Sequence, residues 1–160
     1  MRDEDFERLY EREAQGLFGF LAYRTGDRQL AEDLLADTFE RALRARRRFD
    51  RRRGSERTWL YAIAMNLLRD NARRAAAEGR AVERAEAGAG EAGGGALDSV
   101  EHRDTVQRAL AGLSAEEREA IALRFGADLT VPEIAALLGQ PLTTVEGRVY
   151  RALRKLRERM

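Results

Sequence analysis

Apolar residues in the first half of the chain recur every three to four positions, the spacing of one face of an α-helix. The pattern predicts amphipathic helices over residues ~3–23 and ~28–47, separated by Gly26. The run RRRFDRRRGS breaks the periodicity and predicts a loop, after which Ser55 can cap a third helix. Because no segment of the sequence alternates with period two, these residues are expected to form a small helical bundle.

The middle of the chain, residues 76–103, has a different composition. It is rich in alanine and contains the run GAGEAGGG, which cannot bury enough apolar surface to offset the entropy of an ordered backbone. The alanine-rich start can extend the third helix, and the glycine-rich part predicts a flexible linker.

Helical periodicity returns near residue 106. Three pairs of residues then have the spacing of capping boxes and mark three helix starts: Ser114 with Glu117, Thr130 with Glu133, and Thr143 with Glu146. The first of these helices is expected to run through Phe125 and to end at Gly126. The sequence therefore predicts an all-α protein of two small helical domains, residues 1–75 and 104–160, joined by the linker.

The last two predicted helices have the spacing of a helix-turn-helix unit: Ala135 lets the helices cross, Gly139 permits the turn, and Val145 anchors the second helix. Such a unit inserts the start of its second helix into the major groove of DNA, and its later basic residues contact phosphates. The residues expected near DNA are Thr143, Thr144, Glu146, Gly147, Arg148, Arg151 and Lys155. The alternative is a helical hairpin with a solvated basic face, and Glu146 is open to a second role as a capping residue.

The composition narrows the class of protein. The chain of 160 residues holds no cysteine, which excludes disulfides, thiolate metal sites and cysteine nucleophiles, and which suits a cytoplasmic protein. The first residues are acidic and lack the apolar run of a signal peptide. No stretch approaches the roughly 20 apolar residues of a membrane span, so we expect no membrane insertion, and no cofactor is predicted.

The net charge of +1 averages over opposed blocks. Residues 1–40 carry −6, residues 41–80 carry +9, residues 81–120 carry −5 and residues 121–160 carry +3. The second block includes eight arginines between Arg41 and Arg53, with Phe49 among them. Arginines and aromatic rings together suit single-stranded nucleic acid, where bases stack and phosphates follow a positive groove. The apolar spacing assigns Trp59 to the core and leaves the arginines for phosphate.

Four carboxylates share one face of the second predicted helix: Glu32, Asp33, Asp37 and Glu40. This face can be a solvated stripe, the metal site of a helical hydrolase, or a docking surface for a basic helix. The metal interpretation lacks the Glu–His pair of di-iron bundles, and the single histidine, His102, lies at the edge of the linker, so no metal is predicted.

Four segments resemble, in order, those of the extracytoplasmic-function (ECF) sigma factors of bacterial RNA polymerase. They read AEDLLADTFERALRARRRFD, TWLYAIAMNLLRDNARR, LSAEEREAIALRF and LTVPEIAALLGQPLTTVEGRVYRALRKL. The resemblance covers nearly the whole chain except the linker and implies sigma domain 2 over residues 1–75 and sigma domain 4 over residues 104–160. It implies an alternative sigma factor, not an enzyme, that binds core RNA polymerase and directs promoter-specific initiation.

The resemblance also implies roles for particular residues. The second helix would dock on the β′ clamp helices of the polymerase through Asp33, Leu34, Asp37 and Phe39. The loop and third helix would recognise and melt the −10 promoter element through Arg48, Arg51, Arg52, Arg53, Asn66, Arg69 and Arg73. The last two helices would read the −35 element, domain 4 would also contact the β flap, and an anti-sigma factor is an expected regulator.

Three positions depart from the family pattern. Ala36 stands where a glutamine is common, and Glu146 and Gly147 stand where a basic residue and a serine are common. The base preferences of other members are therefore not transferred to this chain. The alternative function is a stand-alone helix-turn-helix regulator that dimerises on a palindromic site, which would leave the arginine-rich loop and the acidic face without a joint purpose.

Overall fold

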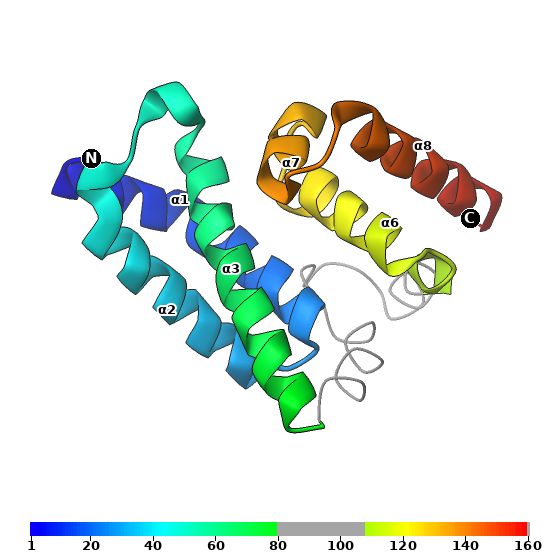
Figure 1. Cartoon of the computed structure of the whole chain (residues 1–160), viewed down its shortest axis with the longest axis horizontal. Coiled ribbons are helices and arrows are strands. Elements are labelled where there is room, and N and C mark those ends of the chain that lie inside the picture. Colours follow the sequence, from blue (N-terminus) through cyan, green and yellow to red (C-terminus); the bar gives the residue numbers. More distant parts are fainter. Residues whose placement is uncertain (80–107, 160) are drawn as a thin grey trace. The chain divides into compact units, whose positions relative to one another are not determined.

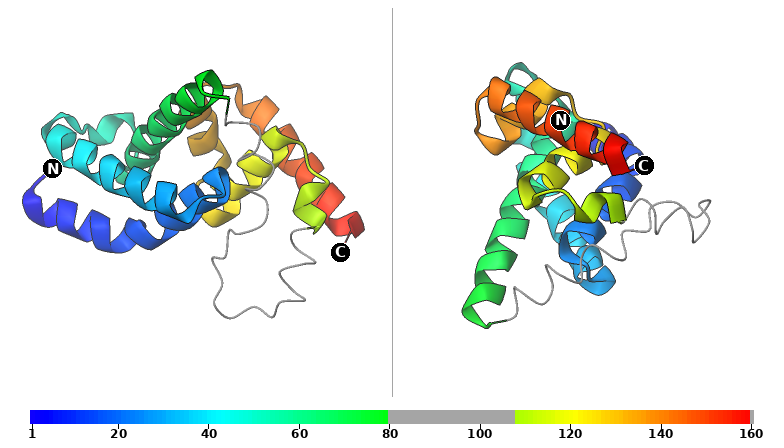
Figure 2. Two further views of the ribbon diagram at one scale, coloured as in Figure 1. Left: turned by 90° about the horizontal axis from the view of Figure 1, so that it is seen from below. Right: turned by 90° about the vertical axis from the view of Figure 1, so that its right-hand side faces the viewer.

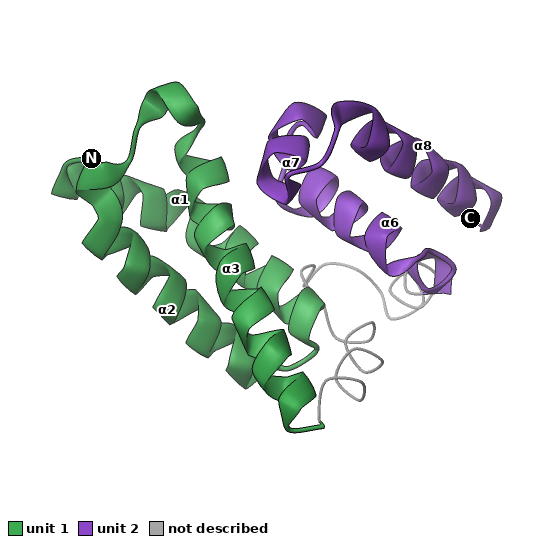
Figure 3. Ribbon diagram, viewed as in Figure 1, with its two compact units in different colours: residues 1–91 green, residues 92–160 purple. Residues whose placement is uncertain are grey.

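The computed structural model describes residues 1–79 and 108–159, and it divides the chain into two compact units, Met1–Glu91 and Ala92–Met160 (Figure 3). Within those described residues all regular structure is helical, which confirms the predicted all-α class. Most of the predicted linker lies outside the described residues; its first two positions, 76 and 77, belong to the third helix.

Unit 1 is a bundle of three helices: α1 (Asp3–Thr25), α2 (Arg28–Ala45) and α3 (Glu56–Ala77). Helices α1 and α2 lie side by side, and α3 packs chiefly against α2 (Figures 1 and 2). Gly26 ends α1 with φ 64°, a left-handed conformation that glycine adopts without a Cβ clash. Asp27 then caps α2, because its Oδ1 accepts a hydrogen bond of 3.1 Å from the Leu30 N–H.

The core of unit 1 combines aliphatic and aromatic side chains. Its fully buried residues include Leu9, Leu17, Leu21, Ala31, Leu60, Tyr61 and Ala64. The Phe20 and Tyr61 rings lie 5.6 Å apart, and burial raises the pKa of Tyr61 above its usual value. Glu13 is also buried, and both of its oxygens lie 3.0 Å from Arg57 Nε. This pair fixes the first turn of α3 to the middle of α1.

The connection between α2 and α3 contains two 3-10 turns, Arg46–Arg48 and Arg51–Arg53, where the sequence predicts a loop. Helix α3 begins as predicted at its cap, since the Thr58 N–H donates to Ser55 Oγ over 3.1 Å. The loop is therefore bounded by two helices whose ends are fixed by local hydrogen bonds.

Unit 2 contains α6 (Ala115–Ile121), α7 (Val131–Leu138) and α8 (Leu142–Arg159). Two predicted capping boxes are confirmed: Ser114 N donates to Glu117 Oε1 over 2.8 Å, and Thr130 N to Glu133 Oε1 over 2.9 Å. The apolar core of the unit includes Leu113, Ile121, Leu123, Leu129, Ile134, Val145, Val149 and Ala152.

The third predicted capping box is wrong. Helix α8 begins at Leu142, so Thr143 lies inside its first turn and cannot precede the helix. The carbonyl of Pro141 instead accepts the Thr144 N–H over 3.1 Å and the Val145 N–H over 3.3 Å. Pro141 is therefore the residue that precedes the helix, and Glu146 does not cap it.

The end of α6 also differs from its prediction. Residues Ala122–Gly126 form a π-helical turn, in which the Ala127 N–H donates to the Ala122 carbonyl over 2.9 Å. The wider turn leaves Phe125 55% exposed, with the Arg124 guanidinium 5.2 Å from the centre of its ring. The sequence predicted a single regular helix through Phe125, without this π-helical turn.

Candidate nucleic-acid interface

The turn between α7 and α8 has the geometry of a helix-turn-helix unit. Gly139 adopts φ 65° and ψ 36°, and the following Gln140 N–H donates to the Ala135 carbonyl over 3.0 Å. Ala135 and Val145 are buried where the two helices pack. The three residues that predicted this unit therefore occupy the crossing, the turn and the anchor.

One face of α8 points away from the core of unit 2. Its exposed residues are Thr143, Glu146, Tyr150, Arg151, Arg154 and Arg157. Gly147 lies half-buried on this face, and a Cβ added there would come 3.0 Å from Arg151 Nη1, so the glycine leaves room for the guanidinium. Thr144 is half-buried at the start of the helix. The structure thus brings together five of the seven residues predicted near the −35 element: Thr143, Thr144, Glu146, Gly147 and Arg151.

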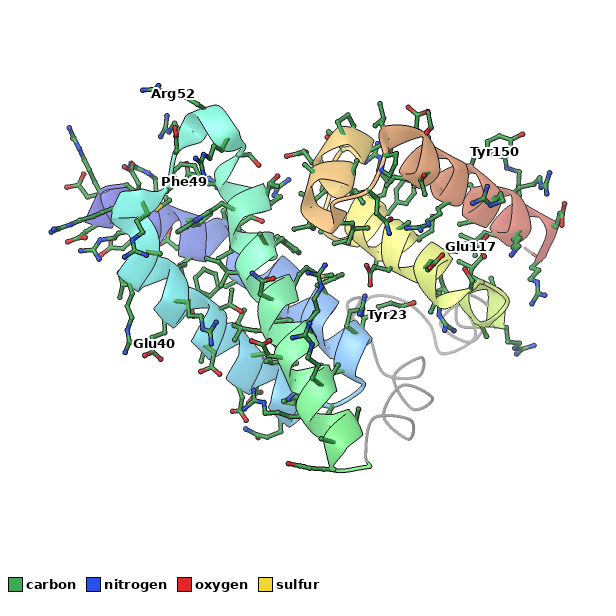
Figure 4. All side chains as sticks on the ribbon, viewed as in Figure 1. Tyr23, Glu40, Phe49, Arg52, Glu117 and Tyr150 are labelled. Atoms are coloured by element: carbon green, nitrogen blue, oxygen red, sulfur yellow. The ribbon has the colours of Figure 1, made fainter. Side chains whose placement is uncertain are left out.

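The other two predicted DNA contacts, Arg148 and Lys155, face α6. Arg148 Nη2 lies 3.5 Å from Glu116 Oε2, Arg148 Nη1 donates to Gln140 Oε1, and the side chain is only 13% exposed. Lys155 Nζ donates to Glu117 Oε1 over 2.8 Å, and Figure 4 shows Glu117 between the two helices. In the free chain both side chains therefore join α8 to α6, and the Lys155 side chain remains 41% exposed.

Glu117 is the centre of this connection. Its carboxylate is buried and accepts hydrogen bonds from Lys155 Nζ and from the Ser114 N–H, both over 2.8 Å. The hydrogen bond from Lys155, followed by that from the Ser114 backbone, lowers the pKa of Glu117 below its ordinary value of 4.5. A lowered folded-state pKa means that the ionised form stabilises unit 2 above pH 4.5 and that this contribution disappears as the pH falls.

A Glu117→Gln variant is therefore expected to be less stable than the wild type above pH 4.5, by about 1–3 kcal/mol. The difference should shrink as the pH falls through the folded-state pKa, because the wild-type carboxylate is then neutral as well. Thermal unfolding of the full chain, followed by circular dichroism between about pH 3 and 7, measures it. Glu158→Gln, at an exposed carboxylate of α8 in the same unit, is the control. A difference that does not change with pH would show that the charge of Glu117 contributes nothing.

The loop between α2 and α3 presents a second basic surface, which we call the arginine loop (residues 46–55). Arg47, Arg48, Arg51, Arg52 and Arg53 are exposed, and Figure 4 shows Arg52 projecting from the tip of the loop. A groove of ≈ 250 Å³ beside the loop is lined by Met1, Arg2, Asp5, Phe49, Arg51 and Glu56. The predicted α3 residues Asn66, Arg69 and Arg73 are exposed and recur at helical spacing, so they share one side of that helix.

The acidic face of α2 is exposed as predicted, with Asp33, Asp37 and Glu40 on the surface. Figure 4 shows Glu40 pointing away from the bundle, where its Oε1 pairs with Arg44 over 2.7 Å. Asp33 and Asp37 line a groove of ≈ 220 Å³ between α2 and α3, together with Leu30, Leu34, Asn71, Arg74, Ala75 and Glu78.

Leu34 and Phe39, which the resemblance assigned to polymerase contact, are inward residues. They are 3% and 6% exposed, and the Phe39 ring packs edge-on against Tyr10, with ring centres 4.8 Å apart. Both side chains hold α2 in the bundle, and Leu34 also lines the groove that contains Asp33 and Asp37.

Two exposed residues were missed from the sequence. Leu43, 41% exposed, lies on the same side of α2 as Ala36 and Glu40, and Tyr150, 67% exposed, lies on the outward face of α8 (Figure 4). The signal was their helical spacing from polar neighbours, three residues after Glu40 for Leu43 and three after Gly147 for Tyr150. Each residue adds apolar surface to a charged face that the sequence analysis had already selected.

Over residues 1–79 and 108–159, no group of His, Cys, Asp and Glu side chains is arranged to hold a metal ion. Over the same residues, no helix has both the length and the apolar character that a bilayer crossing requires.

Comparison with known proteins connects these surfaces to one family. The chain matches the family models for sigma-70 region 2 at residues 9–78 and for sigma-70 region 4 at residues 103–156. It is 32% identical to the ECF RNA polymerase sigma factor BldN of Streptomyces coelicolor, over 94% of this chain and 58% of BldN. It is 34% identical to the ECF RNA polymerase sigma factor SigC of Mycobacterium tuberculosis, over 86% of this chain and 74% of SigC.

A solved structure agrees with these matches. The sigma factor RpoE, in its complex with the anti-sigma factor NepR from Bartonella quintana, is similar with a TM-score of 0.74 and 26% identity. The similarity covers 98% of this chain and 96% of RpoE. The two matched regions, in the order that the four sequence segments predict, place this chain in the sigma-70 family of RNA polymerase sigma factors, in its extracytoplasmic-function group.

Proposed function

We propose that this chain is an alternative sigma factor that binds core RNA polymerase and directs promoter-specific initiation of transcription. The observation that carries the proposal is that both sigma regions are matched and that each corresponds to a unit with a charged surface suited to its role. The alternative function, a stand-alone regulator, explains the helix-turn-helix of unit 2. It does not explain why residues 9–78 match sigma-70 region 2.

The polymerase-binding surface is the exposed side of α2. Asp33, Asp37 and Glu40 offer carboxylates to a basic partner helix, and Leu43 adds an apolar contact at the edge of this face. The partner is the pair of β′ clamp helices of core polymerase, and unit 2 adds a contact with the β flap. The buried Leu34 and Phe39 support this surface from below.

The −10 element is bound by the arginine loop and the exposed side of α3. Arg48 and Arg51–Arg53 contact phosphates of the opened strand, while Asn66, Arg69 and Arg73 extend the polar surface along the helix. Unstacking a base costs a few kcal/mol, which these contacts must offset. Such binding depends on phosphate charge and should weaken steeply with salt.

The −35 element is read by the outward face of α8. Thr143, Gly147 and Arg151 meet the base edges, with Tyr150 as an additional contact and Arg154 on phosphate. Because Gly147 leaves room for the Arg151 guanidinium, the base preference at this position is expected to differ from that of family members with a serine there.

The chain is a specificity subunit and carries out no covalent chemistry, since RNA synthesis belongs to the polymerase. Its place is the cytoplasm, where core polymerase and promoter DNA are found. By analogy with RpoE, which was solved with the anti-sigma factor NepR, an anti-sigma factor is the expected antagonist.

In vitro transcription tests the function directly. Core polymerase is incubated with a library of genomic fragments, with and without the purified chain, and the RNA 5′ ends are sequenced. We expect a set of start sites that appears only with the chain, and co-elution of the chain with core polymerase in gel filtration. Identical start sites in both reactions, together with separate elution, would reject the proposal in favour of a stand-alone regulator.

A further inference from the structure

The arginine loop has an inner side that differs in chemistry from its outer side. The Phe49 ring turns inward and packs against Trp59 of α3, with ring centres 5.2 Å apart and planes at 56° (Figure 4). Both rings are half-buried. This contact fixes the middle of the loop to a helix of the bundle.

Other contacts hold the two turns of the loop. At its start, Arg46 Nε pairs with Asp3 Oδ1 of α1 over 3.0 Å, and Arg46 Nη1 donates to the Leu43 carbonyl over 2.7 Å. At its centre, Asp50 Oδ1 accepts the Arg52 N–H over 3.0 Å, and the Asp50 carbonyl accepts the Arg53 N–H over 3.0 Å. The loop backbone is thus supported by α1, by α3 and by its own hydrogen bonds.

We propose that the Phe49–Trp59 contact and the Asp3–Arg46 bridge are positioning elements that hold the arginine loop in its strand-binding conformation before DNA arrives. The inference rests on the proposed function of the loop. Ordering a free loop on binding would cost conformational entropy for every residue fixed. A loop that is already ordered avoids this cost, and its outward arginines meet the phosphates in a fixed arrangement.

This assigns Phe49 a role different from base stacking. Its ring packs against Trp59, so Phe49 acts through the loop backbone and not through a base. The two roles make different predictions. If Phe49 stacked on a base, removing the ring would weaken binding only to a probe that carries bases. If Phe49 positions the loop, removing the ring weakens binding to a probe with bases and also to a sugar-phosphate backbone without bases.

The test measures binding of the full chain to two probes at about 50 mM salt, by fluorescence anisotropy. One probe is a 12-nucleotide oligothymidylate, and the other is a 12-unit abasic oligomer with the same number of phosphates. An Arg51→Ala/Arg52→Ala/Arg53→Ala variant defines the share of affinity that the loop provides. Phe49→Ala is expected to weaken binding about tenfold on both probes, and Phe49→Leu, which keeps an apolar contact, about twofold. Asp3→Ala should lose less than Phe49→Ala, because Asp3 is 80% exposed.

The matched control is Phe18→Ala. Phe18 is a half-buried ring of α1 beneath Arg28, near the end of α1 opposite to Asp3, so its loss costs stability without touching the loop. Its affinity for both probes should stay at the wild-type value. Loss of affinity in Phe49→Ala on the oligothymidylate alone would show base stacking and overturn the inference, as would unchanged affinity on both probes. If the triple arginine variant binds as tightly as the wild type, the proposed role of the loop fails, and the inference fails with it.

Discussion

An Asp33→Arg/Asp37→Arg variant is expected to lose at least 100-fold in affinity for core RNA polymerase while unit 1 stays folded. Both side chains lie on the exposed side of α2, and Asp33 Oδ1 accepts a long hydrogen bond of 3.4 Å from Gln29 Nε2. Placing arginines against a basic partner replaces attraction by repulsion, which costs several kcal/mol. A loss of about 3 kcal/mol already corresponds to 100-fold in affinity.

The measurement is a titration of labelled chain with core polymerase, beside circular dichroism of the variant. Glu7→Arg/Glu11→Arg is the matched control, because it reverses two exposed carboxylates at the same spacing of four residues on α1. The control should bind core polymerase as the wild type does. Native circular dichroism with undiminished affinity in the Asp33/Asp37 variant would remove α2 as the docking surface.

The second large effect concerns α8. An Arg151→Ala/Arg154→Ala variant is expected to weaken binding of the holoenzyme to the −35 element about 100-fold, since each lost contact of this kind is worth roughly 1–3 kcal/mol. Both arginines are exposed, so unit 2 should unfold at nearly the wild-type temperature. Because Arg154 is the one of the two placed on phosphate, the salt dependence of binding should also become shallower by about one.

An Arg148→Ala/Lys155→Met variant provides the comparison. It removes the same number of charges from the same helix, but from the side that pairs with Glu116 and Glu117. We expect the unfolding temperature of unit 2 to be lower in this variant than in the wild type. At temperatures where the variant is folded, we expect it to bind DNA much more tightly than the Arg151/Arg154 variant does. The reverse ranking, with affinity lost and the unfolding temperature unchanged, would show that Arg148 and Lys155 face the DNA.

The parts of the fold that depend on neighbouring residues could be predicted from the sequence. Gly26 and Gly139 take the left-handed conformations that end their helices, and Ser55, Ser114 and Thr130 cap theirs. Each of these features is decided within a few residues of chain, by a hydrogen bond or a backbone angle that the sequence specifies. The Ala135–Gly139–Val145 spacing predicted the helix-turn-helix for the same reason.

The features that the sequence did not predict depend on residues that the helical spacing does not take into account. Thr143 has the right spacing for a cap, but Pro141 starts the helix earlier. The ion pairs of Arg148 with Glu116 and of Lys155 with Glu117 join residues more than 30 positions apart in the sequence, and periodicity does not reveal such partners. The burial of Phe39 likewise follows from the rings of α1 that cover it.

The composition of the α2 surface has a consequence for how such a subunit shares its enzyme with competitors. The exposed residues of α2 include four carboxylates (Glu32, Asp33, Asp37 and Glu40) and three arginines (Arg28, Arg41 and Arg44), and Leu43 is the one large apolar side chain among the exposed residues described on α2. Attraction between exposed charges fades as ions accumulate, whereas apolar contact does not. At high ionic strength, a competing sigma factor whose docking helix is more apolar would therefore bind a larger share of the core polymerase. At low ionic strength, this chain would bind the larger share. A change in osmolarity would thus redistribute a limited pool of polymerase between the two.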